Sequence, residues 1–282
     1  MSLTTFLQSP AIDSQMEALI CFPRGLTFGV HPLVPAGTPR QTLIGSAFDY
    51  LLRFILQRRF SFAITRPWVA EEGLHALETK LIKQKRLAAP ISPNTLALAF
   101  DLLGRAKRAN LDFIEQGVLT NDTLKSVLYL AHIDLLIRSR KVGKEFGVVY
   151  LSDMNELRGL AEIIPDNVLN PRSSCILNPT FGQASIDIGG ADADLILDGT
   201  LIEIKTSKSP IFSKAYTKQL IGYYILSTLG GIDQAPIGTT IERIGVYSSR
   251  YGKLLTIPLP EILPPASRQW LIDSFQARLR SR

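Results

Sequence analysis

The segment LILDGTLIEIK, residues 195–205, restricts the fold of the chain more than any other feature of the sequence. Asp198 and Gly199 separate two short runs rich in Ile and Leu. Asp-Gly at this spacing is typical of a two-residue type I′ turn, in which both central residues take positive φ. Such a turn fixes which residues face each other, so the segment predicts an antiparallel hairpin with Leu197 opposite Thr200.

Four charged residues fall on one face of this hairpin. The same register, continued along the strands, sets Asp194 opposite Glu203 and Asp192 opposite Lys205. Side chains alternate between the two faces of a strand, so these four project from one side. The apolar residues on the other side are Ala193, Leu195, Ile202 and Ile204. Directly opposed like charges destabilise a sheet, so the Asp194–Glu203 pair needs a compensating charge.

Two interpretations of these charges remain open. The face is either solvated, with Asp192 and Lys205 in a surface salt bridge worth well under ~1 kcal/mol, or it surrounds a divalent cation. Three carboxylates and one ammonium leave a formal charge of −2 on the face. Mg²⁺ binds through one or two carboxylates, keeps waters and takes further ligands from a phosphate. Lys205 would then position a water and balance charge on the scissile phosphate, which is phosphodiester hydrolysis.

A second Glu-x-Lys triplet, Glu78-Thr79-Lys80, provides an internal comparison. It lies in a segment with helical periodicity, and residues two apart on a helix do not face each other. Only the triplet at 203–205 combines a strand, a tight turn and a facing aspartate.

The hairpin and the helix expected after it carry a family resemblance. Asp194 begins one strand, and Glu203 and Lys205 end the next, whereas Gln219 and Tyr223 lie four residues apart on one helical face. This pattern resembles the active-site hairpin of the PD-(D/E)xK nuclease superfamily and the Gln-x-x-x-Tyr element of its RecB-like branch.

The resemblance extends loosely to the helix at 43–56. There Gly-Ser-Ala-Phe-Asp, residues 45–49, is similar to the Gly-Thr-Ala-Val-His of that branch, with Asp49 where the family usually has His. Ala193 stands at the position of the family's Pro. The helical stretch between this helix and the hairpin has no counterpart in the family.

The resemblance implies a fold and a set of site residues. The fold is an α/β restriction-endonuclease-like core, a small mixed sheet flanked by helices. The implied roles are catalysis by Asp194, Glu203 and Lys205, metal binding by Asp194, Glu203, Asp192 and Asp49, and support by Gln219 and Tyr223. Asp192 is either a second metal ligand or the salt-bridge partner of Lys205. The implied cofactor is Mg²⁺ or Mn²⁺.

The chain is expected to form one integrated domain in three segments. These are an irregular lead-in over 1–41, a mainly helical region over 42–144 whose first core helix spans 42–59, and an α/β core over 145–282. Expected strands are 183–188, 192–197, 201–206, 243–249 and 253–259. Expected helices include 153–164, a helix with Ser209 as N-cap, Pro210 at its first position and Gly230 as its stop, and 265–282.

Charge and composition favour a nucleic-acid partner. The chain has 31 Lys and Arg against 25 Asp and Glu, a formal charge of +6, which suits polyanions. Basic residues cluster at 57–59, 83–86, 104–108, 138–144 and 277–282. No apolar run approaches the ~20 residues that cross a bilayer, and the first residues lack the basic start of a secretion signal, so we expect a cytoplasmic protein.

Other metal and nucleophile chemistry finds little support in the sequence. Cys21 and Cys175 are far apart and are expected to stay reduced. His31, His75 and His132 have no His or Cys at ligand spacing, and His132 in an apolar run is expected to be a core or interface residue.

Two hypotheses of function follow. The first is a metal-dependent nuclease that acts on DNA in preference to RNA. The second is a nuclease-like fold without activity that binds nucleic acid or a protein. With either, the helical region can bind a protein partner or a second copy of the chain.

Overall fold

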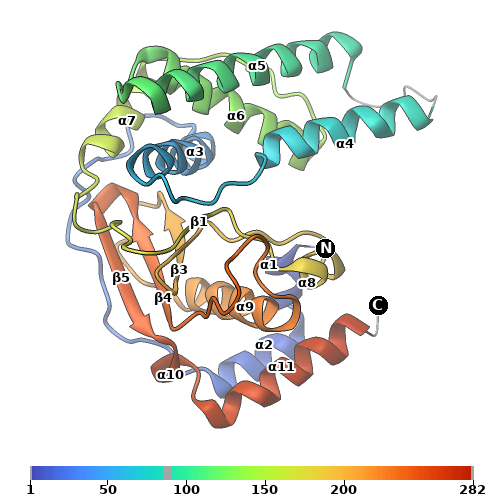
Figure 1. Cartoon of the computed structure of the whole chain (residues 1–282), viewed down its shortest axis with the longest axis vertical. Coiled ribbons are helices and arrows are strands. Elements are labelled where there is room, and N and C mark those ends of the chain that lie inside the picture. The colour runs from blue at the N-terminus through green and yellow to red at the C-terminus, as the bar shows by residue number, and fades with distance from the viewer. Residues whose placement is uncertain (1, 85–90, 281–282) are drawn as a thin grey trace. The chain divides into compact units, whose positions relative to one another are not determined.

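The computed structural model describes residues 2–84 and 91–280 (Figure 1). It is a mixed α/β structure in which helices flank a mixed sheet, as predicted. The chain divides into two compact units. The sheet unit comprises Met1–Pro32, Phe62–Thr65 and Pro165–Arg282, and the helical unit comprises Leu33–Ser61 and Arg66–Ile164. The helical unit therefore begins before the predicted boundary at 42 and continues past that at 144.

The sheet unit contains a sheet in the order β1-β2-β3-β4-β5 among the described residues. Its strands are β1 (Cys175–Leu177), β2 (Leu195–Leu197), β3 (Thr200–Lys205), β4 (Arg243–Ser248) and β5 (Lys253–Pro258). Neighbouring strands are antiparallel except for β3 and β4, which are parallel. Its helices are α1 (Leu3–Leu7), α2 (Pro10–Leu19), α8 (Gly182–Asp187), α9 (Lys214–Gly230), α10 (Leu259–Ile262) and α11 (Pro265–Arg280), with a 3₁₀ turn η1 (Ser249–Tyr251).

Helix α9 covers one face of this sheet. It packs against β3 and β4, and α1 and α11 pack against α9 in turn (Figure 1). Ile196 of β2, Leu201 of β3 and Leu220 of α9 belong to one hydrophobic core, and each is fully buried. The sheet face that carries Ile196 and Leu201 is therefore an interior face.

The predicted hairpin turn is confirmed. Asp198 and Gly199 have φ of 44° and 75°, as a type I′ turn requires. The Asp198 carboxylate also accepts hydrogen bonds from the backbone N–H groups of Arg172, Ser173 and Ser174, at 2.6 to 2.9 Å. Partial burial opposes ionisation of Asp198, but these donors outweigh it and lower its pKa. The observed pairs Leu197–Thr200, Ile196–Leu201 and Leu195–Ile202 match the predicted register.

The prediction of an irregular lead-in over 1–41 is wrong, because α1 and α2 lie within it. Ser2 caps α1 by accepting from Thr5 N at 3.3 Å. Helix α2 has Ser9 at its N-cap and Pro10 at its first position. Ser-Pro followed by apolar residues four apart is a helix start, and this signal was present in the sequence.

Two further predictions in the sheet unit need correction. The predicted strand at 183–188 is wrong, because helix α8 (Gly182–Asp187) occupies this segment. The Ser185 hydroxyl closes the turn locally, accepting from Phe181 N at 2.8 Å and donating to Ala191 O at 2.7 Å. Helix α9 begins after Ser213, which caps it, and not after Ser209. Residues 210–212 are extended instead, since Phe28 N donates to Pro210 O at 2.7 Å.

The helical unit consists mainly of helices, as predicted. It contains α3 (Gln41–Arg59), α4 (Val69–Gln84), α5 (Pro93–Gln116), α6 (Asn121–Ser139) and α7 (Leu151–Glu162). Helix α3 is buried around most of its circumference. Leu43, Ala47 and Leu51 are buried on one face, and the neighbouring residues Ile44, Phe48 and Leu52 are fully buried too. Among the residues that the structure describes, no helix is long and apolar enough to span a bilayer.

A buried acid in the helical unit gives a pH-dependent stability. Asp134 on α6 is 4% exposed and accepts a hydrogen bond from the Tyr50 hydroxyl at 3.1 Å. Burial raises its pKa to about 6. The folded chain thus keeps this proton up to about pH 6, whereas the unfolded chain releases it near pH 3.8. The free energy of unfolding therefore falls as pH rises between these values.

We therefore expect Asp134→Asn to flatten this pH dependence. The amide oxygen can still accept from Tyr50, but the variant has no proton to lose. From pH 5 to pH 8 the wild type should lose roughly 1.4 kcal/mol more unfolding free energy than the variant, the equivalent of one pKa unit. Urea denaturation at both pH values measures this difference, and equal losses would refute the assignment.

The two cysteines should differ in reactivity. Cys21 is exposed and Cys175, on β1, is buried. Burial, with a smaller contribution from the Asp198 carboxylate, raises the pKa of Cys175 to about 12. At pH 8 we expect Ellman's reagent to titrate Cys21 alone in the folded chain, and both thiols in urea. Rapid reaction of both thiols without denaturant would contradict the buried position of β1.

Candidate active site

Glu203 and Lys205 form an ion pair at the end of β3. Both project from the sheet face that α9 covers, and Lys205 Nζ lies 2.7 Å from Glu203 Oε1. Glu203 is 6% exposed, and the Lys205 side chain is 23% exposed. A glutamate buried to this degree is costly unless its charge is paired. The sequence places it there because the two-residue turn fixes the faces of β3.

Helix α9 supplies two more members of this cluster. Gln219 Nε2 donates to Glu203 Oε1 at 2.9 Å and to the Tyr223 hydroxyl at 3.2 Å. Its Oε1 accepts from Lys205 Nζ at 3.2 Å. Both hydrogens of the Gln219 amide are used in this way, so Gln219 fixes the positions of Glu203 and Lys205 together. The spacing of four residues brings Gln219 and Tyr223 to one helical face, as predicted.

Asp194 lies at the point where the hairpin ladder ends. In a regular continuation, Ile204 N would donate to the main chain of Ala193. Instead it donates to Asp194 Oδ2 at 2.6 Å. This bond ties the Asp194 carboxylate to the backbone between Glu203 and Lys205. It is the contact that brings the first predicted site residue to the other two.

The predicted pairing beyond Leu195 is wrong. The hairpin ladder stops at Leu195 and Ile202, so Asp194 and Asp192 are not backbone partners of Glu203 and Lys205. The reason is strand β1, which was not predicted from the sequence. Residues 192–194 pair with the segment that follows β1 and not with β3. Asn178 N donates to Asp194 O at 2.8 Å, Ala193 N donates to Pro179 O at 3.0 Å, and Thr180 bridges to Asp192.

The charges of the site interact although the regular ladder has ended. Burial raises the pKa of Tyr223 well above its ordinary value, and the carboxylates of Glu203, Asp194 and Asp192 add to this effect in that order. The Tyr223 hydroxyl therefore stays neutral. The Tyr223 hydroxyl thus lies within electrostatic reach of all three carboxylates.

Lys205 is held in its charged form. Burial acts to lower its pKa, but the Glu203 carboxylate and, with a smaller contribution, Asp194 outweigh burial and raise it. The ammonium group also lies 5.0 Å from the centre of the Tyr216 ring, a cation–π distance. Lys205 in this arrangement is thus a fixed positive charge and not a proton acceptor.

These contacts exclude a solvated outer face as the explanation of the charges. Glu203 is buried, and Lys205 pairs with it; among the described residues, no ion pair joins Lys205 to Asp192. The alternative in which Asp192 is the salt-bridge partner of Lys205 is therefore wrong.

The turn η1 holds the segment that follows Lys205, and sequence reasoning did not identify it. Arg250, which is fully buried, donates through Nε to Thr206 O at 3.0 Å. Ser249 Oγ lies 3.0 Å from Thr206 Oγ1, and the Tyr251 hydroxyl donates to Lys208 O at 2.8 Å. Only the parallel pairing of β3 and β4 brings these residues beside Lys205, and no local motif signals it.

Asp49 belongs to the helical unit. It lies on α3, where its carboxylate forms an ion pair with Arg53 one turn later. Its role as a metal ligand stays a prediction.

The donor set fits a hard divalent cation in part. Among the described residues, no group of three or more His, Cys, Asp or Glu side chains is placed to hold a metal ion. Mg²⁺ and Mn²⁺ need fewer, because one or two carboxylates suffice when water and phosphate complete the shell. Asp194 and Glu203 provide two carboxylates of this kind, tied to adjacent backbone and side-chain groups of β3.

Comparison of the chain with models of protein families, with curated proteins and with solved structures finds no match.

Proposed function

We propose that the chain is a cytoplasmic nuclease that uses Mg²⁺ or Mn²⁺ to hydrolyse phosphodiester bonds, in DNA in preference to RNA. The observation that carries this proposal is the hydrogen-bonded cluster of Glu203, Lys205 and Gln219, with the Asp194 carboxylate on the adjacent backbone N–H of Ile204. Two acids and one fixed ammonium side by side are suited to a cation, a phosphate and a developing negative charge.

Each residue has a distinct role in this proposal. Asp194 and Glu203 would hold the cation, which supplies Lewis-acid stabilisation of the phosphate when bound. Lys205, charged at neutral pH, stabilises negative charge that develops on the phosphate. Gln219 is a positioning residue, since its amide contacts both Glu203 and Lys205.

The surface charge supports a polyanionic substrate. The predicted basic clusters at 57–59, 104–108 and 138–144 place their Arg and Lys side chains mostly at exposed positions. The clusters at 83–86 and 277–282 lie partly outside the described residues. Exposed Arg and Lys attract phosphates without reading sequence, which suits a nuclease of low sequence specificity.

A cleavage assay tests the proposal. Labelled single-stranded DNA, duplex DNA and RNA are each incubated with the purified chain in Mg²⁺, in Mn²⁺ and in EDTA. We expect cleavage of DNA that requires either metal and stops in EDTA. Absence of cleavage of all three substrates in both metals would refute the proposal.

A second candidate is a nuclease-like module that binds nucleic acid or a protein without cutting. The observation that favours it is the ion pair itself, because the Lys205 ammonium neutralises the Glu203 carboxylate. This module would bind labelled DNA with equal affinity in EDTA and in Mg²⁺ and leave it intact. The helical unit is the part that we propose for a protein partner or a second copy.

A further inference from the structure

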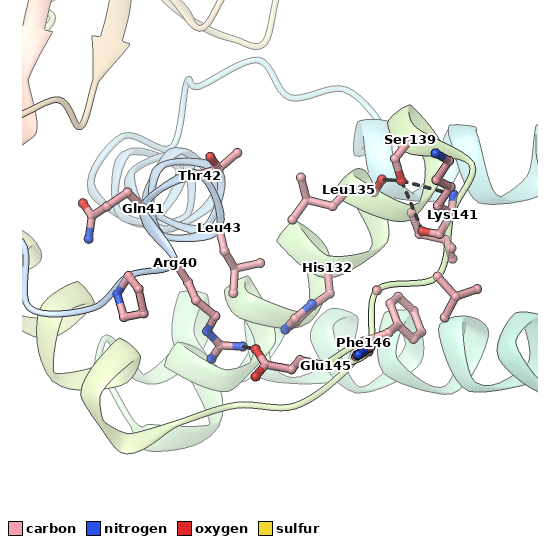
Figure 2. A pocket seen from close by; sticks show the side chains of 15 residues that line it. Arg40, Gln41, Thr42, Leu43, His132, Leu135, Ser139, Lys141, Glu145 and Phe146 are labelled. Carbon is pink, nitrogen blue, oxygen red and sulfur yellow. Dashed lines mark hydrogen bonds and ion pairs between the residues drawn. The ribbon is translucent and has the colours of Figure 1, made fainter.

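One cavity lies wholly within the helical unit, and none of the candidate active-site residues lines it (Figure 2). Its volume is about 610 Å³, within the range of pockets that bind small molecules. The N-terminal end of α3, the C-terminal half of α6 and the segment 141–146 form its walls. That segment contains part of the basic cluster at 138–144 and none of the candidate active-site residues.

The inner wall of this pocket is apolar. Leu43 of α3 and Leu136 of α6 are 3% and 1% exposed, and Leu135 and Phe146 complete the apolar lining. Figure 2 shows Leu43, Leu135 and His132 around one space. An apolar surface of this size favours a ligand with an apolar or aromatic body.

The outer wall of the pocket carries positive charge. Lys141 and Lys144 line the pocket and are exposed, and neither has an ion-pair partner among the described residues. Arg40 differs, because its guanidinium already pairs with Asp153 and lies 3.5 Å from Glu145. The two lysines therefore give the mouth of the pocket a net positive charge.

His132 adds a neutral polar group. Burial lowers its pKa, so the ring is uncharged at neutral pH. Its Nε2 lies 3.0 Å from the Val148 carbonyl oxygen, and a carbonyl accepts only, so Nε2 carries the hydrogen. Nδ1 is then an acceptor. The expected role of a core residue is confirmed, and the positive charge of the pocket comes from the lysines and not from this ring.

We propose that this pocket binds a small amphipathic anion, with its apolar body against the leucines and Phe146 and its anionic group at Lys141 and Lys144. The apolar surface inside suits the body of such a molecule, and the charge at the mouth favours an anion over a neutral or cationic molecule with the same body. The inference concerns the helical unit alone and does not depend on the nuclease proposal.

The test uses two fluorescent probes with the same kind of body. 8-Anilino-1-naphthalenesulfonate carries a sulfonate, and N-phenyl-1-naphthylamine is uncharged. We expect the full chain to bind the sulfonate probe at one saturable site. Lys141→Gln/Lys144→Gln should weaken that binding by at least about fivefold, since two exposed charge contacts are lost, and change the affinity for the neutral probe less than twofold.

A lysine away from the pocket provides the control. Lys253→Gln on β5, also exposed, should leave the binding of both probes unchanged. The substituted lysines are exposed, so the variants should fold, and circular dichroism checks this. The proposal is overturned if the sulfonate probe does not bind at a single saturable site, or if the double variant binds it as tightly as the wild type does.

Discussion

Glu203→Gln should lower metal-dependent DNA cleavage by about three orders of magnitude and leave the chain folded. Glutamine has the shape of glutamate, and its Oε1 can still accept from Lys205 and Gln219. The substitution removes the negative charge that a cation needs, and loss of one such electrostatic contact typically costs 10²–10³ in rate, so about 10³ is expected where a metal is also lost. Initial cleavage rates in Mg²⁺ or Mn²⁺ measure the effect.

The second Glu-x-Lys triplet provides a matched control. Glu78 lies on α4, and its side chain is 41% exposed and lies 3.8 Å from His75. Glu78→Gln removes one carboxylate, as Glu203→Gln does, without touching the candidate site. It should cut at the rate of the wild type. Equal loss in both variants would show that charge in general, and not the site, decides activity.

Gly230→Ala should destabilise the chain by about 3 kcal/mol. Gly230 is the last residue of α9, where it passes α8. A Cβ there would overlap the Phe181 carbonyl oxygen and lie 2.9 Å from its carbon. Because these are backbone atoms, no side-chain rotation relieves the clash, and overpacking of this kind costs 1–3 kcal/mol or more. Urea denaturation gives the change in unfolding free energy.

Gly104→Ala is the opposite case. Gly104 lies within α5, and among the described residues a Cβ there would meet only the end of the Arg108 side chain, at 3.7 Å. Alanine is the better helix former, so this variant should be more stable by roughly 0.5–1 kcal/mol. If Gly230→Ala and Gly104→Ala have equal unfolding free energies, the close contact between the end of α9 and α8 described above would be refuted.

Local signals in the sequence were sufficient to predict the parts of the fold that depend on local chemistry. Asp198 and Gly199 fixed the turn and three residue pairs between β2 and β3, and the periodicity of apolar residues predicted α3 and the mainly helical region that follows it. The spacing of Gln219 and Tyr223 placed both on the face of α9 that meets Glu203.

Long-range contacts decided the parts that the sequence could not reveal. Strand β1 is a buried run of three residues without alternation, which periodicity does not distinguish from a loop. Residues 192–194 pair with the extension of β1 and not with β3. Asp194 therefore contacts β3 through its carboxylate, which accepts from Ile204 N. Segment 183–188 alternates like a strand, but the hydroxyl of Ser185 closes a helix there.

The position of the charged face was the least predictable feature of the site. From the sequence, the four charges of the hairpin fit either a solvated face or a metal site, and in the structure α9 covers that face and Glu203 is buried. Lys205 and Gln219, which lie 2 and 16 residues further along the chain, hydrogen-bond to the Glu203 carboxylate and offset the cost of burying its charge. The sequence could suggest these partners through the resemblance, but not the depth of the site.

Calorimetric titration of Mn²⁺ tests most directly whether Asp194 and Glu203 hold a cation. The wild type should bind Mn²⁺ at a saturable site, and Glu78→Gln should bind it equally well. Asp194→Asn, which keeps an oxygen to accept from Ile204 N, should bind it at least about tenfold more weakly, as loss of a ligand charge requires. Failure of the wild type to bind Mn²⁺, or equal binding by Asp194→Asn, would contradict the proposed metal site.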